Sequence, residues 1–394
     1  MNNAGVAAPT PRERRILLVL CAFYAAVVIP IGIRKGPDLE NHLRLADQFL
    51  RGLPLYPANP TLGVWWPPFT LVALAPLALV ARWSLAAAKA MFALLGVACL
   101  GWSITRLRDP AWPRTALMVA AVSVPLQTNF EYLNLNAVLL ALVVAAGADL
   151  AAGRDTRAGV WLGLATAAKL FPVVLLGYCA YRRRWRACVV GAVTGLGLTA
   201  LPLLAASNAD APAAARRWVS SSLAGGWTLH PGNQSLGALV GRAGGGHSLA
   251  IVVELVVCAL VAVALRKPPP VERLREEVGI VTLVAVLLSP IAWSHYFLLA
   301  MPAWAAALAP ERARASGGRT MALVVAGIAT SGVLTLSSYT FKRMLLSQSI
   351  FTWGGLLLLG VLLTERARAS LAAPRSGTAA GTARTPLPPT APQE

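Results

Sequence analysis

Asp38 is the first residue whose type and position in the sequence suggest catalysis. It directly follows an apolar stretch, in the segment 36–40. An aspartate before a helix commonly caps the helix through a backbone hydrogen bond. A carboxylate at the boundary of water and lipid is also partly desolvated, which favours general-base catalysis. A third hypothesis pairs Asp38 with Glu40 at a metal ion, but two carboxylates alone make a weak site, so we predict no metal.

Two further ionisable residues lie within or at the end of apolar stretches. Lys169 precedes Pro172 in the middle of one stretch. An unpaired lysine near the bilayer centre costs about 2.5 kcal/mol or more, so a functional role is the default, and a cation suits a lipid phosphate. The alternative is that Lys169 extends toward the interface. His295 follows Trp293 and Ser294 at the end of another stretch, where it is either an interfacial anchor or part of a site.

Amide and aromatic side chains add chemistry that suits a sugar. Asn233 and Gln234 lie side by side in a polar segment and offer donors and acceptors for hydroxyl groups. Asn233 also begins a glycosylation sequon, which is a frequent chance match. Asn134 and Asn136 offer the same chemistry, although helix capping explains them as well. Trp66 fits an interfacial belt or a wall that stacks on a sugar.

The elements that must position these residues are apolar helices. The chain has 394 residues, of which 57% are hydrophobic and 13% are charged. Apolar stretches recur from Ile16 to Leu363, each long enough to cross a bilayer as a helix. This pattern excludes a soluble enzyme, and it excludes an outer-membrane barrel, whose strands alternate. We predict an all-α, polytopic membrane protein.

The net charge of +19 comes from basic clusters between the apolar stretches. This distribution is typical of loops that face an anionic leaflet, and we predict membrane lipids and no nucleic acid as partners. The five cysteines form no metal-binding or disulfide pattern and are predicted to be packing residues. The first apolar stretch has no cleavage site and is predicted to stay as a helix rather than act as a signal peptide.

The hydropathy pattern predicts about twelve spans, with both termini in the cytoplasm. The predicted spans are 16–33, 65–81, 84–105, 115–133, 134–152, 158–180, 187–206, 249–265, 278–293, 296–310, 320–339 and 344–363. Two loops predicted outside, 106–114 and 154–157, carry arginines against the rule, so the topology is weakest between 106 and 157. Asp149 and Glu254 are intramembrane acids that could neutralise Lys169 or an arginine.

Four segments are predicted to lie outside the membrane domain of residues 16–363 or between its spans. Residues 1–15 form the cytoplasmic N-terminus, and residues 34–62 form a first outer loop. Within that loop, apolar residues recur at helical spacing over 39–50, which predicts an amphipathic helix on the membrane surface. Residues 207–248 form a second long outer loop. The tail 364–394 has little to bury and is predicted to be disordered and cytoplasmic.

Six short motifs in chain order resemble bacterial glycosyltransferases of family 87. The motifs are Asp38 with residues 39–56, residues 66–68, Asn136 with Asn134, residues 167–172 with the basic run 182–186, residues 233–236, and residues 288–295. Family 87, also described as DUF2029, uses polyprenyl-phosphate sugars and includes mycobacterial phosphatidylinositol-mannoside mannosyltransferases. The resemblance implies a C-type glycosyltransferase architecture in the plasma (inner) membrane, with its site on the extracytoplasmic face.

The resemblance also implies a mechanism. Asp38 would be the general base that deprotonates the acceptor hydroxyl as it attacks the anomeric carbon with inversion. The donor would be a polyprenyl-phosphate-linked hexose, which the resemblance to mannosyltransferases implies to be mannose. The acceptor would be a glycolipid or a glycan. Lys169 and His295 would stabilise the lipid phosphate that leaves, so no cofactor is expected. Leu39 and His42 depart from aromatic residues common in the family, which puts acceptor packing in doubt.

Two other functions remain open at this point. A multi-span transporter or lipid flippase would suit the many spans and buried ionisable residues, although no paired repeat is found. A membrane-embedded assembly partner is the third alternative, and no specific residue supports it. The sequence does not determine the sugar, the acceptor, the linkage or the oligomeric state.

Overall fold

The computed structural model describes residues 10–56, 66–109, 111–205, 211–223, 229–270, 273–309 and 316–372. Parts of the predicted N-terminal segment, of both predicted outer loops and of the predicted tail fall outside these ranges. Within them, every regular element is helical, which confirms the predicted all-α class.

The helices follow one another along the chain in two halves. The first half comprises α1 (Pro11–Arg34), α2 (Pro37–Leu50), α3 (Pro68–Ala73), α4 (Ala75–Trp83), α5 (Leu85–Leu107), α6 (Trp112–Ala120), α7 (Ser123–Tyr132), α8 (Asn136–Ala151), α9 (Asp155–Ala168) and α10 (Val173–Tyr181). The second half comprises α11 (Trp185–Ala205), α12 (Ala211–Leu223), α13 (Leu236–Arg242), α14 (His247–Ala264), α15 (Leu274–Leu287), η4 (Ser294–Ala300), α16 (Met301–Ala307), α17 (Gly317–Ser331), η6 (Val333–Leu336), α18 (Tyr339–Ser347) and α19 (Ile350–Ala372).

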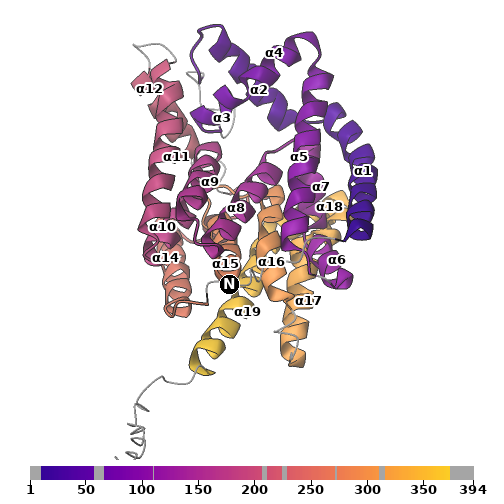
Figure 1. Cartoon of the computed structure of the whole chain (residues 1–394), viewed down its shortest axis with the longest axis vertical. Helices are drawn as coiled ribbons and strands as arrows, with labels where there is room; N and C mark the ends of the chain where they lie inside the picture. The colour runs from indigo at the N-terminus through magenta and orange to yellow at the C-terminus, as the bar shows by residue number, and fades with distance from the viewer. Residues whose placement is uncertain are drawn as a thin grey trace, which may run out of the picture.

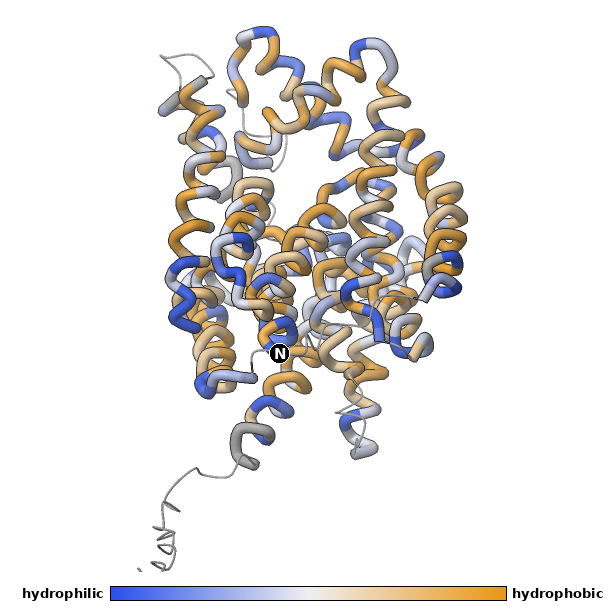
Figure 2. Tube along the Cα trace, viewed as in Figure 1, coloured by the Kyte–Doolittle hydropathy of each residue, from blue (hydrophilic) through white to orange (hydrophobic). Residues whose placement is uncertain are grey.

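Six helical segments of the described chain are long and apolar enough to cross a membrane. They are Pro11–Arg34, Leu85–Leu107, Trp185–Leu204, His247–Ala264, Gly317–Leu336 and Ile350–Arg368. Apolar residues run along the outer helices, and hydrophilic residues gather toward their ends (Figure 2). Many of these apolar side chains are exposed, as expected for surfaces that face lipid, whereas α15 is buried on nearly all sides. The protein is therefore a multi-pass membrane protein.

The predicted count of twelve single spans is not reproduced, because several predicted spans are broken helices. Predicted span 65–81 forms the short helices α3 and α4, with Pro76 near the start of α4, and 115–133 forms α6 and α7. At the other end of the chain, α19 continues as helix to Ala372, past the predicted end of the last span. Proline and polar residues interrupt the helices at these breaks.

Predicted span 158–180 is a helical hairpin rather than one span. Helix α9 ends at Ala168, Lys169 is in extended backbone, and Pro172 precedes α10. Arg184, just after α10, forms an ion pair with Asp155 at the start of α9, with 3.3 Å between Nη1 and Oδ1. The two ends of the hairpin therefore lie together, and Lys169 lies at its tip.

A second hairpin joins α15 to η4 and α16. A Cβ on Gly279 of α15 would come within 2.8 Å of the Pro302 backbone in α16, which shows how closely the two arms pack. The tip is the non-helical segment 289–293, and η4 begins at Ser294, followed by His295. Both hairpin tips thus carry a residue that the sequence singles out.

Arginines of the loops 106–114 and 154–157 form ion pairs. The loop 106–114 contacts the start of α1, and the arginines of 154–157 pair with a nearby acid. Arg108 forms an ion pair with Glu13 of α1, with 3.2 Å between Nη1 and Oε1. Asp149 pairs with Arg154 at 2.6 Å and with Arg157 at 3.5 Å, and not with Lys169. The sequence prediction placed the loop 106–114 and the start of α1 on opposite sides of the membrane, whereas the Arg108–Glu13 ion pair brings them to the same end of the protein.

Helices α2, α3 and α4 cap one end of the helical body, and the last turns of α19 project from the opposite end (Figure 1). The apolar positions of α2, among them Leu39, Leu43 and Ala46, are buried. They pack against protein, chiefly α3 and α4, rather than lying on lipid. This cap holds the first turn of α2 over the core of the protein.

Small residues bring α9 and α11 into close contact. Gly159 and Gly163 on α9 face Gly191 and Gly195 on α11, and a Cβ on Gly163 would lie 2.5 Å from the Cβ of Thr194. Such spacing of small residues lets helix backbones approach in membranes. The contact supports the arm of the hairpin that leads to Lys169.

Gly163→Val is expected to destabilise the folded protein by about 1–3 kcal/mol, because the added atoms must displace Thr194 or the α11 backbone. Thermal unfolding in detergent measures this effect. Gly177→Val is the matched control, because a Cβ there meets no atom within 4 Å. Equal melting temperatures for the two variants would contradict the role given to this contact.

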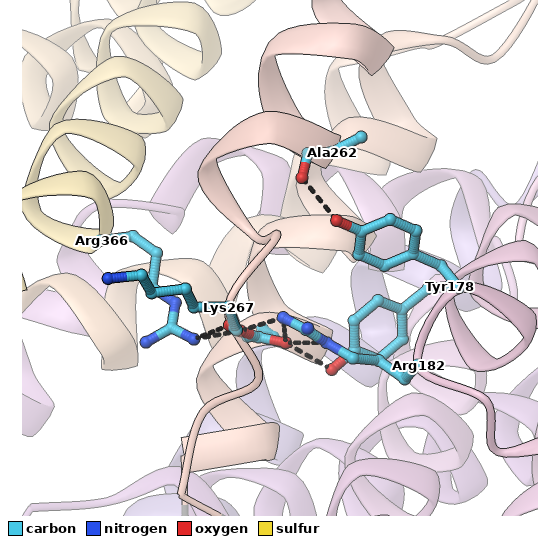
Figure 3. Close-up of polar contacts among 7 residues, drawn as sticks. Tyr178, Arg182, Ala262, Lys267 and Arg366 are labelled. Atoms are coloured by element: carbon cyan, nitrogen blue, oxygen red, sulfur yellow. Dashed lines mark hydrogen bonds and ion pairs between the residues drawn. The ribbon is translucent and has the colours of Figure 1, made fainter. Parts of the chain in front are cut away.

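Glu277 of α15 connects two other helices, α10 and α19. Figure 3 shows the residues Tyr178, Arg182, Lys267 and Arg366 of this cluster. It accepts hydrogen bonds from Tyr178 at 2.8 Å and from Arg182 Nε at 2.8 Å, and it pairs with Arg366 at 2.9 Å. Arg366 also donates to the Lys267 carbonyl at 2.7 Å. Two guanidinium groups and a hydroxyl compensate this buried carboxylate.

Tyr178→Phe is expected to lower stability by about 1 kcal/mol, because one buried donor to the carboxylate is lost while both arginines remain. Tyr181→Phe removes a comparable hydroxyl, whose partner is the Ala262 carbonyl at 2.6 Å, but at an exposed site. We expect Tyr181→Phe to have the smaller effect on the unfolding temperature. The reverse order would show that Glu277 does not depend on Tyr178.

Candidate active site

Asp38 lies in the first turn of α2, but it does not cap the helix. The N-cap residue is Gly36, in a left-handed conformation with φ +44°. A side chain at Gly36 would be strained in this conformation, and its Cβ would lie 2.7 Å from Leu133 Cδ1. Gly36 also donates its backbone N–H to the Glu131 carbonyl at 2.9 Å. This close turn brings the Asp38 carboxylate to the junction of α7 and α8.

The Asp38 carboxylate is hydrogen-bonded to Asn134. The Nδ2 group of Asn134 donates to Oδ2 of Asp38 at 2.7 Å. Asn134 lies just after Leu133, whose left-handed backbone (φ 51°) ends α7 and turns the chain into α8. The other oxygen, Oδ1, is available for a proton.

Lys169 fixes the orientation of two asparagine side chains. Its Nζ donates to Oδ1 of Asn134 at 3.0 Å and to Oδ1 of Asn136 at 2.9 Å. It also lies over the ring of Tyr296, 3.6 Å from the centroid. Asn136 in turn donates from Nδ2 to the His295 carbonyl at 3.1 Å. A buried network therefore connects the tips of both hairpins to Asp38.

The pKa of Asp38 is raised above its ordinary value. Burial is the main cause, and the hydrogen bond from Asn134 and the charge of Lys169 partly oppose it. Since the carboxylate is partly shielded from water and only its Oδ2 atom has a hydrogen-bond partner among the described residues, it is suited to accept a proton from a hydroxyl group.

His42 secures the turn that carries Asp38. Its Nδ1 donates to the Asp38 carbonyl at 2.6 Å, its Nε2 accepts from the Trp66 backbone N–H at 3.2 Å, and its ring stacks on Trp66. Burial lowers the pKa of His42 to about 3, so the ring is neutral at physiological pH. Where the family commonly has an aromatic residue, this chain therefore has the flat ring of His42, which forms two hydrogen bonds.

Glu40 does not join Asp38 in an acidic pair. Its carboxylate forms an ion pair with the buried Lys89 of α5, at 2.9 Å. Lys89 also donates to the carbonyls of Ile33 and Lys35. The metal hypothesis for the two carboxylates therefore has no support in their placement.

A cavity of about 770 Å³ opens beside Asp38. Residues singled out in the sequence line it, among them Asp38, Trp66, Asn134, Trp293, Ser294 and His295. The Nε2 atom of His295 is buried without a hydrogen-bond partner in the described part of the chain. A buried polar atom without a partner at a cavity wall suggests a ligand contact.

A second, smaller cavity of about 250 Å³ shares Trp66 and Tyr296 with the first. Lys169 also lines it, and most of its other lining residues are apolar. They are Pro67, Leu170, Phe171, Val173, Val174, Trp218, Ala285, Leu288, Ser289, Pro290 and Ile291. The site thus has a polar cavity and an apolar one on either side of the same two aromatic residues.

Asn233 and Gln234 line neither cavity. Asn233 donates to the Pro290 carbonyl at 3.1 Å and accepts from the Ala292 N–H at 2.9 Å. Gln234 donates to the Leu346 carbonyl at 2.8 Å. Both side chains are fully buried, and their hydrogen bonds hold the tip of the second hairpin and helix α18 in place.

Sequence reasoning considered Asn134 only as a sugar-binding or helix-capping amide, not as a partner of Asp38, and it missed several residues of the cavity wall. The missed residues are Asn41, Thr128, Glu131, Tyr132, His230, Pro231, Gly232, Tyr296, Tyr339, Lys342, Arg343 and Leu346. Asn134 and Asn136, separated by one residue at the break between α7 and α8, were a sequence pattern that could have indicated a polar site for Asn134. No local pattern indicated that α18 forms part of the same wall.

Comparisons with known proteins find two similar mannosyltransferases. A polyprenol-phosphate-mannose-dependent alpha-(1-2)-phosphatidylinositol mannoside mannosyltransferase of Mycolicibacterium smegmatis is 28% identical over 302 residues, which cover 67% of this chain and 68% of that protein. The corresponding phosphatidylinositol pentamannoside mannosyltransferase of the same organism is 25% identical over 251 residues, which cover 60% of this chain and 59% of that protein. No solved structure matches the chain.

The profile of glycosyltransferase family 87 matches residues 65–290. The matched segment contains the first hairpin tip, the two asparagines and Trp66. Helix α2 with Asp38 precedes it, and Trp293, Ser294 and His295 follow it. Because the profile covers more than half of the sequence, the chain belongs to glycosyltransferase family 87.

Proposed function

We propose that this enzyme transfers a hexose, mannose by analogy with its relatives, from a polyprenyl-phosphate donor to a glycolipid or glycan acceptor. The observation that carries the proposal is the Asp38 carboxylate, held on one oxygen by Asn134 and open on a cavity of about 770 Å³. The printed names of both relatives specify a polyprenol-phosphate-mannose donor and phosphatidylinositol mannoside acceptors.

In this proposal Asp38 is the general base of an inverting transfer. The acceptor hydroxyl loses its proton to Oδ1 of Asp38 while its oxygen attacks the anomeric carbon of the donor. The bond between that carbon and the phosphate oxygen breaks, and the electron pair leaves with polyprenyl phosphate. The raised pKa of Asp38 strengthens it as a base.

His295 is the proposed contact of the leaving phosphate. With its proton on Nε2, the ring donates to a phosphate oxygen from the atom that has no partner in the described chain. Trp66, Trp293 and Ser294, which line the same cavity, supply stacking surfaces and a hydroxyl for the sugar. The mechanism invokes no cofactor.

Lys169 acts through its neighbours in this proposal. Its three contacts go to Asn134, Asn136 and the face of Tyr296. Through Asn134 it positions the Asp38 carboxylate, and its positive charge stabilises the negative charge of that carboxylate. The smaller apolar cavity beside it, between α10 and α15, suits the first isoprenoid units of the donor. The donor phosphate then lies where the apolar and polar cavities meet, near the shared residues Trp66 and Tyr296.

We place the site on the extracytoplasmic face of the plasma membrane, with both termini in the cytoplasm. Arg182 and Arg366, the latter in the last turns of α19, both pair with Glu277. The last turns of α19 project from the end opposite α2 (Figure 1). The positive-inside rule places this end in the cytoplasm. A cysteine-labelling experiment on intact cells, with a cysteine at Arg44 and another at Arg368, tests the assignment.

The proposed activity is tested with purified protein in detergent, radiolabelled polyprenyl-phosphate-mannose and a membrane glycolipid extract. A labelled glycolipid and free polyprenyl phosphate in equal amounts are expected. A protein that moves the labelled lipid across a proteoliposome bilayer but forms no labelled product would instead be a transporter, which is the alternative function.

A further inference from the structure

Helix α18 contributes one face to the wall of the larger cavity. Tyr339, Lys342, Arg343 and Leu346 all line this cavity, and their spacing places them on one side of the helix. The helix packs mainly against η6 and α19, whereas Asp38 comes from α2. The cations of α18 and the base thus reach the same cavity from separate parts of the fold.

The two cations have no acidic partner in the described residues. Among the cavity acids, Glu131 is paired with Lys35 at 3.2 Å, and Asp38 is held by Asn134. No hydrogen bond or ion pair involves the side chains of Lys342 and Arg343 in the part of the chain that the structure describes. Two adjacent cations beside a cavity, an ammonium and a guanidinium, favour a phosphate group.

The rest of α18 indicates a lipid-borne ligand rather than a soluble one. Phe341 and Met344 are exposed, and none of its residues is buried. An amphipathic helix with exposed apolar residues and neighbouring cations is typical of the membrane interface, where lipid phosphates lie. Its position is braced by the Leu346 carbonyl, which accepts from Gln234.

We propose that Lys342 and Arg343 bind the phosphodiester of an anionic glycolipid acceptor, whose sugar headgroup extends through the cavity toward Asp38. This inference rests on the proposed glycosyltransfer. The donor is the less suitable source of the phosphate, because its phosphate is bonded to the reacting carbon and must lie beside Asp38 and His295. An acceptor phosphodiester is separated from the reacting hydroxyl by sugar units, so it can lie at α18.

The test compares two acceptors with the same sugar and acyl chains, a phosphatidylinositol mannoside and an uncharged mannosyl-diacylglycerol. In full-length protein in nanodiscs, the double variant Lys342→Gln/Arg343→Gln is expected to raise the KM for the anionic acceptor by about 10-fold or more. The KM for the neutral acceptor and for the polyprenyl-phosphate donor should stay within about twofold of the wild type.

Two matched variants define the controls. Lys342→Arg/Arg343→Lys keeps both charges and should restore most of the affinity for the anionic acceptor. Arg44→Gln removes an exposed arginine of α2 that bonds Asn41 and does not line the cavity, and it should change neither KM.

Three results would overturn the inference: an unchanged KM for the anionic acceptor, an equal rise for the neutral one, or a rise confined to the donor. If the wild type transfers sugar to neither acceptor, the proposed function fails and not this inference. Native mass spectrometry of phosphatidylinositol mannoside binding then decides the inference, since the double variant must still bind less of this lipid than the wild type.

Discussion

Asp38→Asn is expected to lower kcat for sugar transfer by about 10²–10⁴-fold, the range typical of a lost general base. The amide has the shape of the carboxylate and can keep the hydrogen bond from Asn134 through its oxygen. Its NH₂ group then faces the acceptor hydroxyl, where it offers a donor in place of the proton acceptor that the reaction needs. Radiolabelled transfer under single-turnover conditions measures the loss.

The variant should still bind the donor, because the carboxylate acts on the acceptor. The dissociation constant for polyprenyl-phosphate-mannose is expected to stay within about threefold of the wild type. Glu40→Gln is the matched control: it removes a carboxylate two residues away that pairs with Lys89 and is half exposed. Turnover by Asp38→Asn at the level of Glu40→Gln would show that another group takes the proton.

The sequence singled out residues that the structure brings close together, but it predicted the path of the chain less well. Asp38, Lys169 and His295 stand out locally, because a charged or titratable residue beside an apolar stretch needs a reason. The structure connects these three residues through Asn134 and Asn136, which the sequence could present only as polar residues near a helix start.

The topology was harder to predict, because length and hydropathy do not distinguish one span from two short arms. The hairpin with Lys169 at its tip has as many apolar residues as a spanning helix, and only the long-range pair Arg184–Asp155 shows that it turns back. The same limit applies to Asn233 and Gln234. Their composition suits sugar binding, but their partners are backbone groups 57 and 112 residues away.

Lys169→Met is expected to lower kcat/KM by about 10²-fold, because a loss of alignment at the base has effects of this size. Methionine preserves the length of the side chain but leaves Oδ1 of both Asn134 and Asn136 without their donor. Asn134 is then free to rotate its amide and to present Oδ1 to Asp38, which would repel the carboxylate. Initial rates at several acceptor concentrations measure the change.

The pH profile distinguishes this positioning role from a general loss of structure. Activity falls at acid pH as Asp38 becomes protonated, so the acid limb of kcat/KM follows the pKa of Asp38 in the free enzyme. The charge of Lys169 and the Asn134 hydrogen bond both lower that pKa against the effect of burial. Removing Lys169 therefore raises the pKa, and the acid limb moves to higher pH.

Lys89→Met provides the comparison, because Lys89 is also a buried lysine near the start of α2. Its contacts are Glu40 and two backbone carbonyls, and it is absent from the interactions that set the pKa of Asp38. Lys89→Met should lower stability while the acid limb stays in place. If both variants shifted the limb equally, or neither did, Lys169 would be a structural lysine and not a residue that tunes the base. An upward shift in Lys169→Met alone would place the control of the base at the tip of the first hairpin.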